Sequence, residues 1–269
     1  TLTLLTAIVA GACSSQETSK TSKASSDTAK GETKVQKIIV GTGTQFPNVC
    51  FIDKNGKLNG YDVELVRKID EKLPEYKFEF KTMEFSNLLI SLETNKIDFI
   101  AHQMEVNEER QKKFLFNSEP YNIFPLHVTV KQDNNEINSI KDLKGKKVIV
   151  SATSNSAVFI EKYNKEHNAG IQIVYAGNGP DSTINQIKTG RADATITTPF
   201  SVDFLNKQVD AQEKVVGEPL LNSKVYFLLR KDETPLQKRI DEALVELKKE
   251  GVVGELSKKW LGADYTVNF

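Results

Sequence analysis

Two short segments of the sequence carry side chains suited to binding a carboxylate. Arg110 lies in the charged run 107–113, and its guanidinium is a planar, permanently charged fork that matches a carboxylate bidentately. Residues 151–155 (SATSN) lie between an expected strand and an expected helix, whose first-turn N–H groups favour an anion. The residue types alone also fit a solvated surface arginine and a helix cap. At this point both interpretations stay open.

The sequence shows no pattern typical of a metal site or of nucleophilic catalysis. The two cysteines, Cys13 and Cys50, cannot form a disulfide framework, and there is no Cys/His cluster of the zinc type. No Ser/His/Asp or Cys/His arrangement can be identified. Lys plus Arg and Asp plus Glu both number 36, so no basic surplus attracts nucleic acid or anionic lipid. We therefore expect no cofactor, no metal, no nucleic-acid partner, and either a small molecule or another protein as the partner.

The elements that must position these residues alternate between strand and helix. The first set has strands at 38–40, 78–80 and 97–101 and helices over 61–73 and 86–93. The second set repeats the order, with strands at 148–150, 171–175 and 194–196 and helices over 155–167 and 182–189. Helices between strands favour parallel sheets, which bind ligands at the C-terminal ends of their strands. The repeat predicts two α/β lobes that face each other across a cleft.

The C-terminal region adds a strand and two helices. A strand-like run covers 225–230, Thr234 and Pro235 fit an N-cap and a first-turn proline, and Gly251 separates the two helices. We expect this part of the chain to return to the first lobe, so that two crossings form a two-stranded hinge. The expected division places lobe 1 at 36–124 plus 222–269 and lobe 2 at 125–221.

The N-terminal segment predicts export and anchoring. Residues 2–12 (LTLLTAIVAGA) are too short to span a bilayer but fit the apolar region of a signal peptide. Residues 10–13 (AGAC) resemble the lipobox of bacterial lipoproteins, in which the cysteine is acylated. The next residues are rich in Ser and Thr and have no large apolar side chain. We expect a signal-peptide remnant at 1–12, and a lipidated (palmitoylated) Cys13 with a flexible tether over 13–35 that hold the domain at the extracytoplasmic face of the cell membrane.

Six further segments follow one another in an order typical of one protein family. They are 55–63 (NGKLNGYDV), 83–86 (MEFS), 107–113 (NEERQKK), 116–121 (FNSEPY), 190–194 (GRADA) and 257–262 (SKKWLG). With these segments, residues 37–262 resemble the extracytoplasmic solute-binding proteins of family 3, which feed ATP-driven (ABC) importers of polar amino acids. The resemblance implies a periplasmic-binding-protein-like type II fold, amino-acid transport, and a membrane permease as partner. We also expect a monomer without enzymatic activity.

The resemblance implies roles for five residues of lobe 1. Arg110 matches the family's receptor for the ligand carboxylate, which agrees with the chemistry of a guanidinium. Phe46 and Phe85 match aromatic positions that flank the ligand side chain. Gln103 and Glu105 lie where the family presents backbone carbonyls and a hydroxyl to the ligand ammonium.

In lobe 2 the resemblance implies that Ser154 and Asn155 meet the carboxylate from the face opposite Arg110. The family usually has an aspartate for the ammonium after the last strand of lobe 2, but Thr198 holds that position here. Because a buried ammonium without an anion costs several kcal/mol, we expect Glu105 to supply the missing charge. The region of Gln103 and the run 197–203 (TTPFSVD) look most like cystine-binding members, and cystine has two ammonium and two carboxylate groups.

Two other functions compete with this interpretation. A cyclohexadienyl dehydratase is known on the same fold, and such an enzyme would need a general acid or base such as Glu105 or His102. An extracellular sensor or adhesin domain is the third possibility. Cys50 fits a small apolar filler, although an exposed thiol near a cystine site would invite exchange.

Overall fold

The first set of predicted strands forms the parallel part of a mixed sheet. The computed structural model describes residues 35–177 and 180–267, and the side chains of these residues except 180–182. Strand β1 (Gln36–Thr42) pairs in parallel with β5 (Tyr76–Thr82) and with β6 (Phe99–Glu105). Helices α1 (Tyr61–Lys72) and α2 (Phe85–Glu93) connect these strands. The five predicted elements of this set are confirmed, and β6 continues beyond its predicted end to Glu105.

Helices cover both faces of this part of the sheet. Val40 belongs to the buried cluster that contains Leu65 of α1, whereas its neighbour Ile39 packs against the cluster that contains Leu88 and Leu92 of α2. Successive side chains of a strand point to opposite faces, so α1 and α2 lie on opposite sides of β1. A sheet buried on both faces is what the predicted α/β class requires.

The second set of strands repeats the arrangement. Strand β9 (Lys147–Val150) pairs in parallel with β10 (Gln172–Tyr175) and β11 (Ala194–Thr197). Helix α4 (Asn155–His167) follows β9, and α5 (Pro180–Lys188) follows β10. The predicted order β-α-β-α-β is confirmed for this set too, and α4 has the predicted ends.

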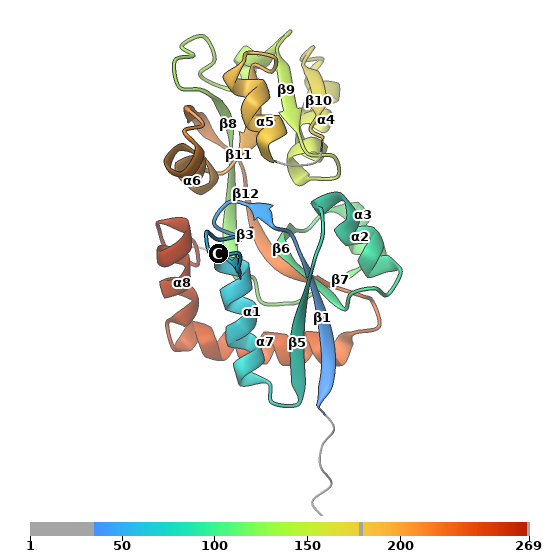
Figure 1. The fold of residues 1–269 in the computed structure, drawn as a ribbon. Coiled ribbons are helices and arrows are strands. Elements are labelled where there is room, and N and C mark those ends of the chain that lie inside the picture. The colour runs from blue at the N-terminus through green and yellow to red at the C-terminus, as the bar shows by residue number, and fades with distance from the viewer. Residues whose placement is uncertain (1–34, 178–179, 268–269) are drawn as a thin grey trace, which may run out of the picture. The chain divides into compact units, whose positions relative to one another are not determined.

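Two long antiparallel strands join the two sets into one sheet. Strand β8 (Asn122–Lys131) pairs with β12 (Glu213–Leu229) from Asn122↔Val225 to Lys131↔Glu213. Strand β8 also pairs with β11, and β12 also pairs with β6, so the strand order is β10-β9-β11-β8-β12-β6-β1-β5 (Figure 1). The expected two crossings are therefore β8 and β12. The sequence predicted only the last part of β12 and missed β8, because charged and polar residues interrupt both apolar patterns.

The C-terminal helices pack against α1. Helix α7 (Thr234–Lys249) buries its apolar stripe, and α8 (Val252–Leu261) follows after Gly251, whose φ of 78° places it in the left-handed region. The prediction of Thr234 as N-cap is wrong. Glu233 holds the cap position without a side-chain cap bond, and Thr234 is the first helical residue. None of the helices in the described residues is long and apolar enough to cross a membrane.

Several short elements complete the described part of the chain. The sequence predicted none of them, because they are too short for a clear period or begin at a proline. They are β2 (Gln45–Phe46), β3 (Cys50–Ile52), β4 (Leu58–Asn59), α3 (Glu108–Lys113), β7 (Leu115–Phe116), the 3-10 helix η1 (Ile140–Leu143) and α6 (Pro199–Val209). Strands β2, β3 and β4 form a small separate sheet.

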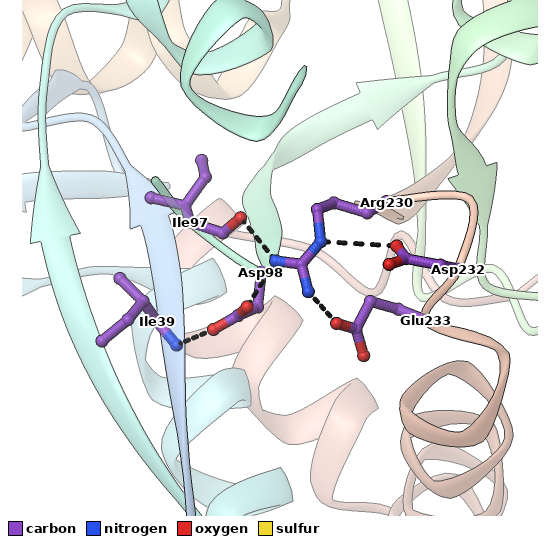
Figure 2. A network of polar contacts seen from close by, with 6 residues as sticks. All are labelled: Ile39, Ile97, Asp98, Arg230, Asp232 and Glu233. Atoms are coloured by element: carbon purple, nitrogen blue, oxygen red, sulfur yellow. Dashed lines mark hydrogen bonds and ion pairs between the residues drawn. The ribbon is translucent and has the colours of Figure 1, made fainter. Parts of the chain in front are cut away.

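A polar network fastens the end of β12 to the first strand set. The guanidinium of Arg230 contacts the carboxylates of Asp98 and Glu233 and donates to the carbonyl of Ile97 at 3.1 Å (Figure 2). Asp98 in turn accepts from the backbone N–H of Ile39 on β1 at 2.6 Å. Arg230 thus links the start of β6 to the beginning of α7, and its partner Asp98 extends this link to β1. This network lies away from the strand ends that carry the candidate site.

Candidate functional site

A cavity of about 310 Å³ lies where the strands of the two sets end. Its walls include residues at or directly after the C-terminal ends of β6, β9 and β11, together with the first turns of α2 and α4. This is the position at which parallel α/β sheets bind ligands. The volume is at the lower end of the range of small-molecule pockets, which suits a ligand of amino-acid size.

Arg110 lies in the wall of this cavity and is only 4% exposed. Helix α3 positions it, because the side chain of the N-cap Asn107 accepts from the Arg110 backbone N–H at 2.9 Å. Its Nη1 donates to the carbonyl of Glu105 at 2.8 Å, and its Nη2 donates to the carbonyl of Thr153 at 3.1 Å. The Nε group has no hydrogen-bond partner in the part of the chain that the structure describes. A buried guanidinium that faces a cavity with an unused N–H can receive a carboxylate.

The carboxyl group of Glu105 lies in the same wall. It is 4% exposed, and its Oε1 has no hydrogen-bond partner among the described residues. Burial raises the pKa of Glu105 to about 7, against the smaller opposing effects of Ser223, Arg110 and Asn155. Burial also lowers the pKa of Arg110, and the charge of Glu105 counteracts that effect. The cavity therefore contains one cation, Arg110, beside the carboxyl group of Glu105. A second cation, such as a ligand ammonium, would favour the fully ionised form of this carboxyl group.

The N-terminus of α4 forms part of the cavity wall close to Arg110. Ser154 is the N-cap, since its Oγ accepts from the Ala157 N–H at 3.1 Å and donates to the Ser151 carbonyl at 2.7 Å. The capping role considered from the sequence is therefore confirmed. Asn155 accepts from Asn107 at 2.8 Å through its Oδ1, and this bond links the start of α4 to the N-cap residue of α3. Ser154 and Asn155 both line the cavity together with Arg110.

Three rings form an aromatic wall. The ring centroids of Phe46 and Phe85 each lie 5.0 Å from the ring centroid of His102, and all three residues line the cavity. Burial lowers the pKa of His102 to about 4, so the imidazole is neutral at physiological pH. Gly43 leaves the space for it, because a Cβ at that position would lie 2.8 Å from His102 Nε2. The sequence singled out the two phenylalanines but assigned His102 only to the enzyme alternative.

Gln103 lines the cavity, but its side chain is engaged in the interior. Its backbone is in the left-handed region at φ 50°, and its N–H and side-chain amide both donate to the buried Asp62, at 2.9 and 2.6 Å. Its Oε1 accepts from Asn122 at 2.8 Å. Burial raises the pKa of Asp62 to about 6, while its hydrogen bonds with Gln103 and Tyr121 act in the opposite direction. Gln103 therefore offers the cavity mainly its backbone, and Asp62 is a positioning residue that the sequence did not reveal.

Thr198 does not lie among the residues that line the cavity. It is fully buried as the N-cap of α6, and its hydroxyl donates to the Ser201 Oγ at 2.9 Å. The neighbouring Thr197 and Ser201 line the cavity in its place. The side chain of Thr198 therefore caps α6 and does not line the cavity. A threonine directly before a first-turn proline favours this capping role.

Glu213 is a second cavity residue that the sequence did not reveal. It is 2% exposed, and none of the residues described in the structure donates a hydrogen bond to its Oε1. Burial raises its pKa to about 7. In the sequence it is one of several charged residues in the run 210–214 (DAQEK), which carries no signal of burial.

The described residues contain no group of three or more His, Cys, Asp or Glu side chains that could hold a metal ion. Cys50, which lies behind the aromatic wall, is fully buried. Burial raises the pKa of its thiol to about 12, so the group is inert packing in this position. The interpretation as a small apolar filler is confirmed. Cys13 lies outside the described residues.

Comparison with known proteins gives a consistent family. The family model of bacterial extracellular solute-binding proteins, family 3, matches residues 38–263. The L-cystine-binding protein TcyK of Bacillus subtilis (strain 168) is 57% identical over 242 residues, 90% of each chain. The L-cystine-binding protein TcyJ of the same organism is 54% identical over 237 residues, 88% of each chain.

A solved structure agrees with these relatives. It is described as a putative L-cystine ABC transporter from Listeria monocytogenes, has 62% sequence identity and a TM-score of 0.82, and covers 86% of this chain and 98% of its own. The two relatives are named as solute-binding proteins and not as enzymes. The chain therefore belongs to the bacterial extracellular solute-binding proteins of family 3.

Proposed function

We propose that this protein binds L-cystine and delivers it to an ATP-driven importer in the membrane. The observation that carries the proposal is the buried Arg110, which lines a cavity of amino-acid size beside the buried carboxyl group of Glu105, whose Oε1 has no partner among the described residues. Such a pair complements the carboxylate and the ammonium of an amino acid. The names of the relatives support cystine among the polar amino acids.

The proposed roles follow the positions of the side chains. Arg110 binds one ligand carboxylate, which the N-terminus of α4 at Ser154 and Asn155 meets from the other side. Glu105 and the backbone of Gln103 receive the ammonium of the same end. The ligand's apolar atoms pack on the aromatic wall of Phe46, Phe85 and His102.

Titration calorimetry of Arg110 variants with L-cystine tests the proposal. A charge-assisted bidentate pair is worth about 1.5–3 kcal/mol, so Arg110→Ala should weaken L-cystine binding roughly tenfold to a hundredfold or more. Arg110→Lys should keep the charge but recover only part of the affinity, since an ammonium cannot form the fork. Arg191→Ala, at an exposed arginine, is the matched control and should bind normally. Unchanged affinity in Arg110→Ala, or no L-cystine binding by the wild type, contradicts the proposal.

We further propose that two lobes close over the ligand, with lobe 1 at 36–124 plus 222–269 and lobe 2 at 125–221. The crossing strands β8 and β12 support this division, because they lead from one strand set to the other. Closure would need a few kcal/mol of differential affinity, which contacts from both sides to one carboxylate can supply. The closed form is what a permease would recognise.

The protein in this proposal is a monomeric lipoprotein anchored through Cys13 at the extracytoplasmic face of the cell membrane. Support for export comes from the family, whose members are extracellular solute-binding proteins, and from the apolar run and lipobox in the sequence. Growth with an alkyne-tagged palmitate should label the wild type but not Cys13→Ser, and the variant should appear in the medium. Size-exclusion chromatography with light scattering checks the monomer.

We propose binding without chemical turnover. Glu105 is the cavity residue best suited to act as a general acid, given its raised pKa, but it lies next to Arg110, which suits an ammonium receptor equally. Incubation with prephenate or arogenate separates the two functions. The proposal expects no aromatic product.

A further inference from the structure

We propose that Glu213 recognises a second cationic group at the far end of the ligand and so selects two-headed amino acids over single amino acids. This inference rests on the proposed function, because it names a further specificity residue of the same cavity. It concerns a carboxyl group that neither the family resemblance nor the predicted site includes. The ligand class is an amino acid with two ammonium groups separated by a chain of several bonds.

The strand register places Glu213 in the deep part of the cavity. Glu213 lies opposite Lys131 of β8, and Thr197, at the end of β11, lies opposite His127. Measured along β8, the position of Glu213 is therefore four residues from the end of β11, which is roughly 13 Å at the rise of a strand. We call these two positions the deep level and the level of the strand ends. Arg110 and Glu213 nevertheless line the same cavity. A ligand held by its carboxylate at Arg110 must be long to reach the carboxyl group of Glu213.

The cavity wall around Glu213 also contains polar and apolar side chains. Thr183 and Ile184 of α5, Thr195 of β11 and Leu205 of α6 line the cavity together with Glu213. The Thr195 hydroxyl donates to the Ile149 carbonyl at 2.7 Å and keeps its acceptor capacity. Apolar side chains can therefore contact the middle of a ligand, while the oxygen atoms of Glu213 and Thr195 accept from its cationic end.

Within residues 35–177 and 180–267, no cation pairs with Glu213. Lys131 is its direct neighbour in the sheet, but the Lys131 ammonium pairs with Asp133 at 2.9 Å. Lys188, at the end of α5, donates to the carbonyl of Asp210 at 3.0 Å. The Oε1 atom of Glu213 thus remains unpaired at 2% exposure, although an unpaired buried carboxylate is costly. A ligand ammonium would supply the missing partner, and burial without such a partner agrees with the pKa raised to about 7.

The resulting cavity has a charge pattern that suits two amino-acid ends. Arg110 and Glu105 lie together at the level of the strand ends, and Glu213 lies alone at the deep level. A single amino acid would use only the first level and would leave Glu213 unpaired. A ligand with two ammonium groups gains a second charge-assisted hydrogen bond.

The test compares Glu213→Gln with wild type for two ligands. L-cystine carries two ammonium groups. S-methyl-L-cysteine contains one cysteine half of the same molecule, with a methyl group on its sulfur, and carries a single ammonium group. Titration calorimetry at pH 7.5 should show a loss of at least tenfold for L-cystine in the variant, and a change below threefold for S-methyl-L-cysteine. Glu218→Gln, at an exposed glutamate of the same strand, is the control and should bind both ligands as the wild type does.

The outcomes separate this inference from the proposed function. If Glu213→Gln binds L-cystine like the wild type, the inference is overturned while the proposed function stands. Equal losses for both ligands also overturn it, because they indicate a structural role. The melting temperature of the ligand-free variant supports this distinction, since the isosteric change should not lower it. If wild-type protein fails to bind L-cystine at all, the proposed function fails first.

Discussion

At the scale of single residues, the charge of the cavity depends on two carboxyl groups that ionise more readily when a cation lies beside them. Glu105 and Glu213 are both almost fully buried, and burial raises the pKa of each to about 7. Arg110 is close to Glu105 but donates to its backbone carbonyl. A carboxyl group in this state is half protonated near neutral pH, so its affinity for an ammonium must depend on pH.

Affinity for L-cystine should therefore rise with pH. Below pH 7 each ligand ammonium must displace a proton from its carboxyl group, so Glu105 and Glu213 should each lower affinity by up to roughly tenfold per pH unit. Above pH 7 the carboxylate is ionised and the dependence should flatten. His102 adds nothing over this range, because burial lowers its pKa to about 4. Titration calorimetry between pH 5.5 and pH 8 measures the profile.

Glu105→Gln supplies the comparison for this prediction. The variant should bind more weakly at pH 8, and its profile should be flatter than that of the wild type, with the remaining slope due to Glu213. Binding at wild-type strength with the wild-type profile would show that Glu105 does not receive the ammonium. The same carboxyl affects ligand-free stability with a defined sign. Its folded pKa lies above the unfolded value, so stability falls as pH rises from about 4.5 to 7.

At the scale of elements, the end of β6 shows how the fold presents backbone to the cavity. Gln103 has a left-handed backbone, which is unfavourable for a residue with a side chain. Asp62, at the start of α1, holds it through three donors, which are the Gln103 N–H, the Gln103 side-chain amide and the Tyr121 hydroxyl. The first helix of the fold thus fixes the strand end on which Glu105 lies two residues later.

Asp62→Asn should destabilise the protein by about 2–4 kcal/mol. The amide replaces one acceptor oxygen by a donor that faces other donors, which leaves buried groups unpaired. Urea denaturation of the ligand-free protein measures the change. Glu71→Gln, on the exposed side of the same helix, should cost less than about 0.5 kcal/mol. If both variants lose the same small amount, Asp62 does not support the strand end.

The sequence predicted elements whose apolar side chains repeat with a clear period, and it failed where burial involves polar residues. The helix at 155–167 has the predicted ends, because its cap and its stripe are both visible. Asp62 and Glu213 could not be identified, since a buried acid and an exposed acid look alike without the three-dimensional partners. Arg110 was placed only through the family resemblance, because its charged neighbours equally fit a surface arginine.

At the scale of the whole domain, hydrogen bonds of the described residues cross between the proposed lobes. Asn107 donates to Asn155 at 2.8 Å, and Arg110 donates to the Thr153 carbonyl at 3.1 Å. Asn48 donates to the carbonyl of Phe200 at 3.1 Å and does not line the cavity. Arg110 and Asn155 line the cavity, whereas Asn48 and Phe200 do not, so the Asn48 bond can act only through the approach of the lobes.

Removing the Asn48 donor should therefore weaken ligand binding without removing a ligand contact. Asn48 has φ 63°, so Asn48→Gly keeps the backbone conformation and deletes only the side chain, while Asn48→Asp places an acceptor against the Phe200 carbonyl. One hydrogen bond of about 0.5–1.5 kcal/mol predicts a twofold to tenfold loss of L-cystine affinity in Asn48→Gly and a larger loss in Asn48→Asp.

The loss of affinity should lie in the dissociation rate, because opening of the lobes must precede release of the ligand. Stopped-flow kinetics measures both rates, and small-angle scattering of the ligand-bound variants should show a larger radius of gyration. Wild-type rates in both variants would mean that this contact does not contribute to closure, and that the lobes are held only by the groups around the ligand.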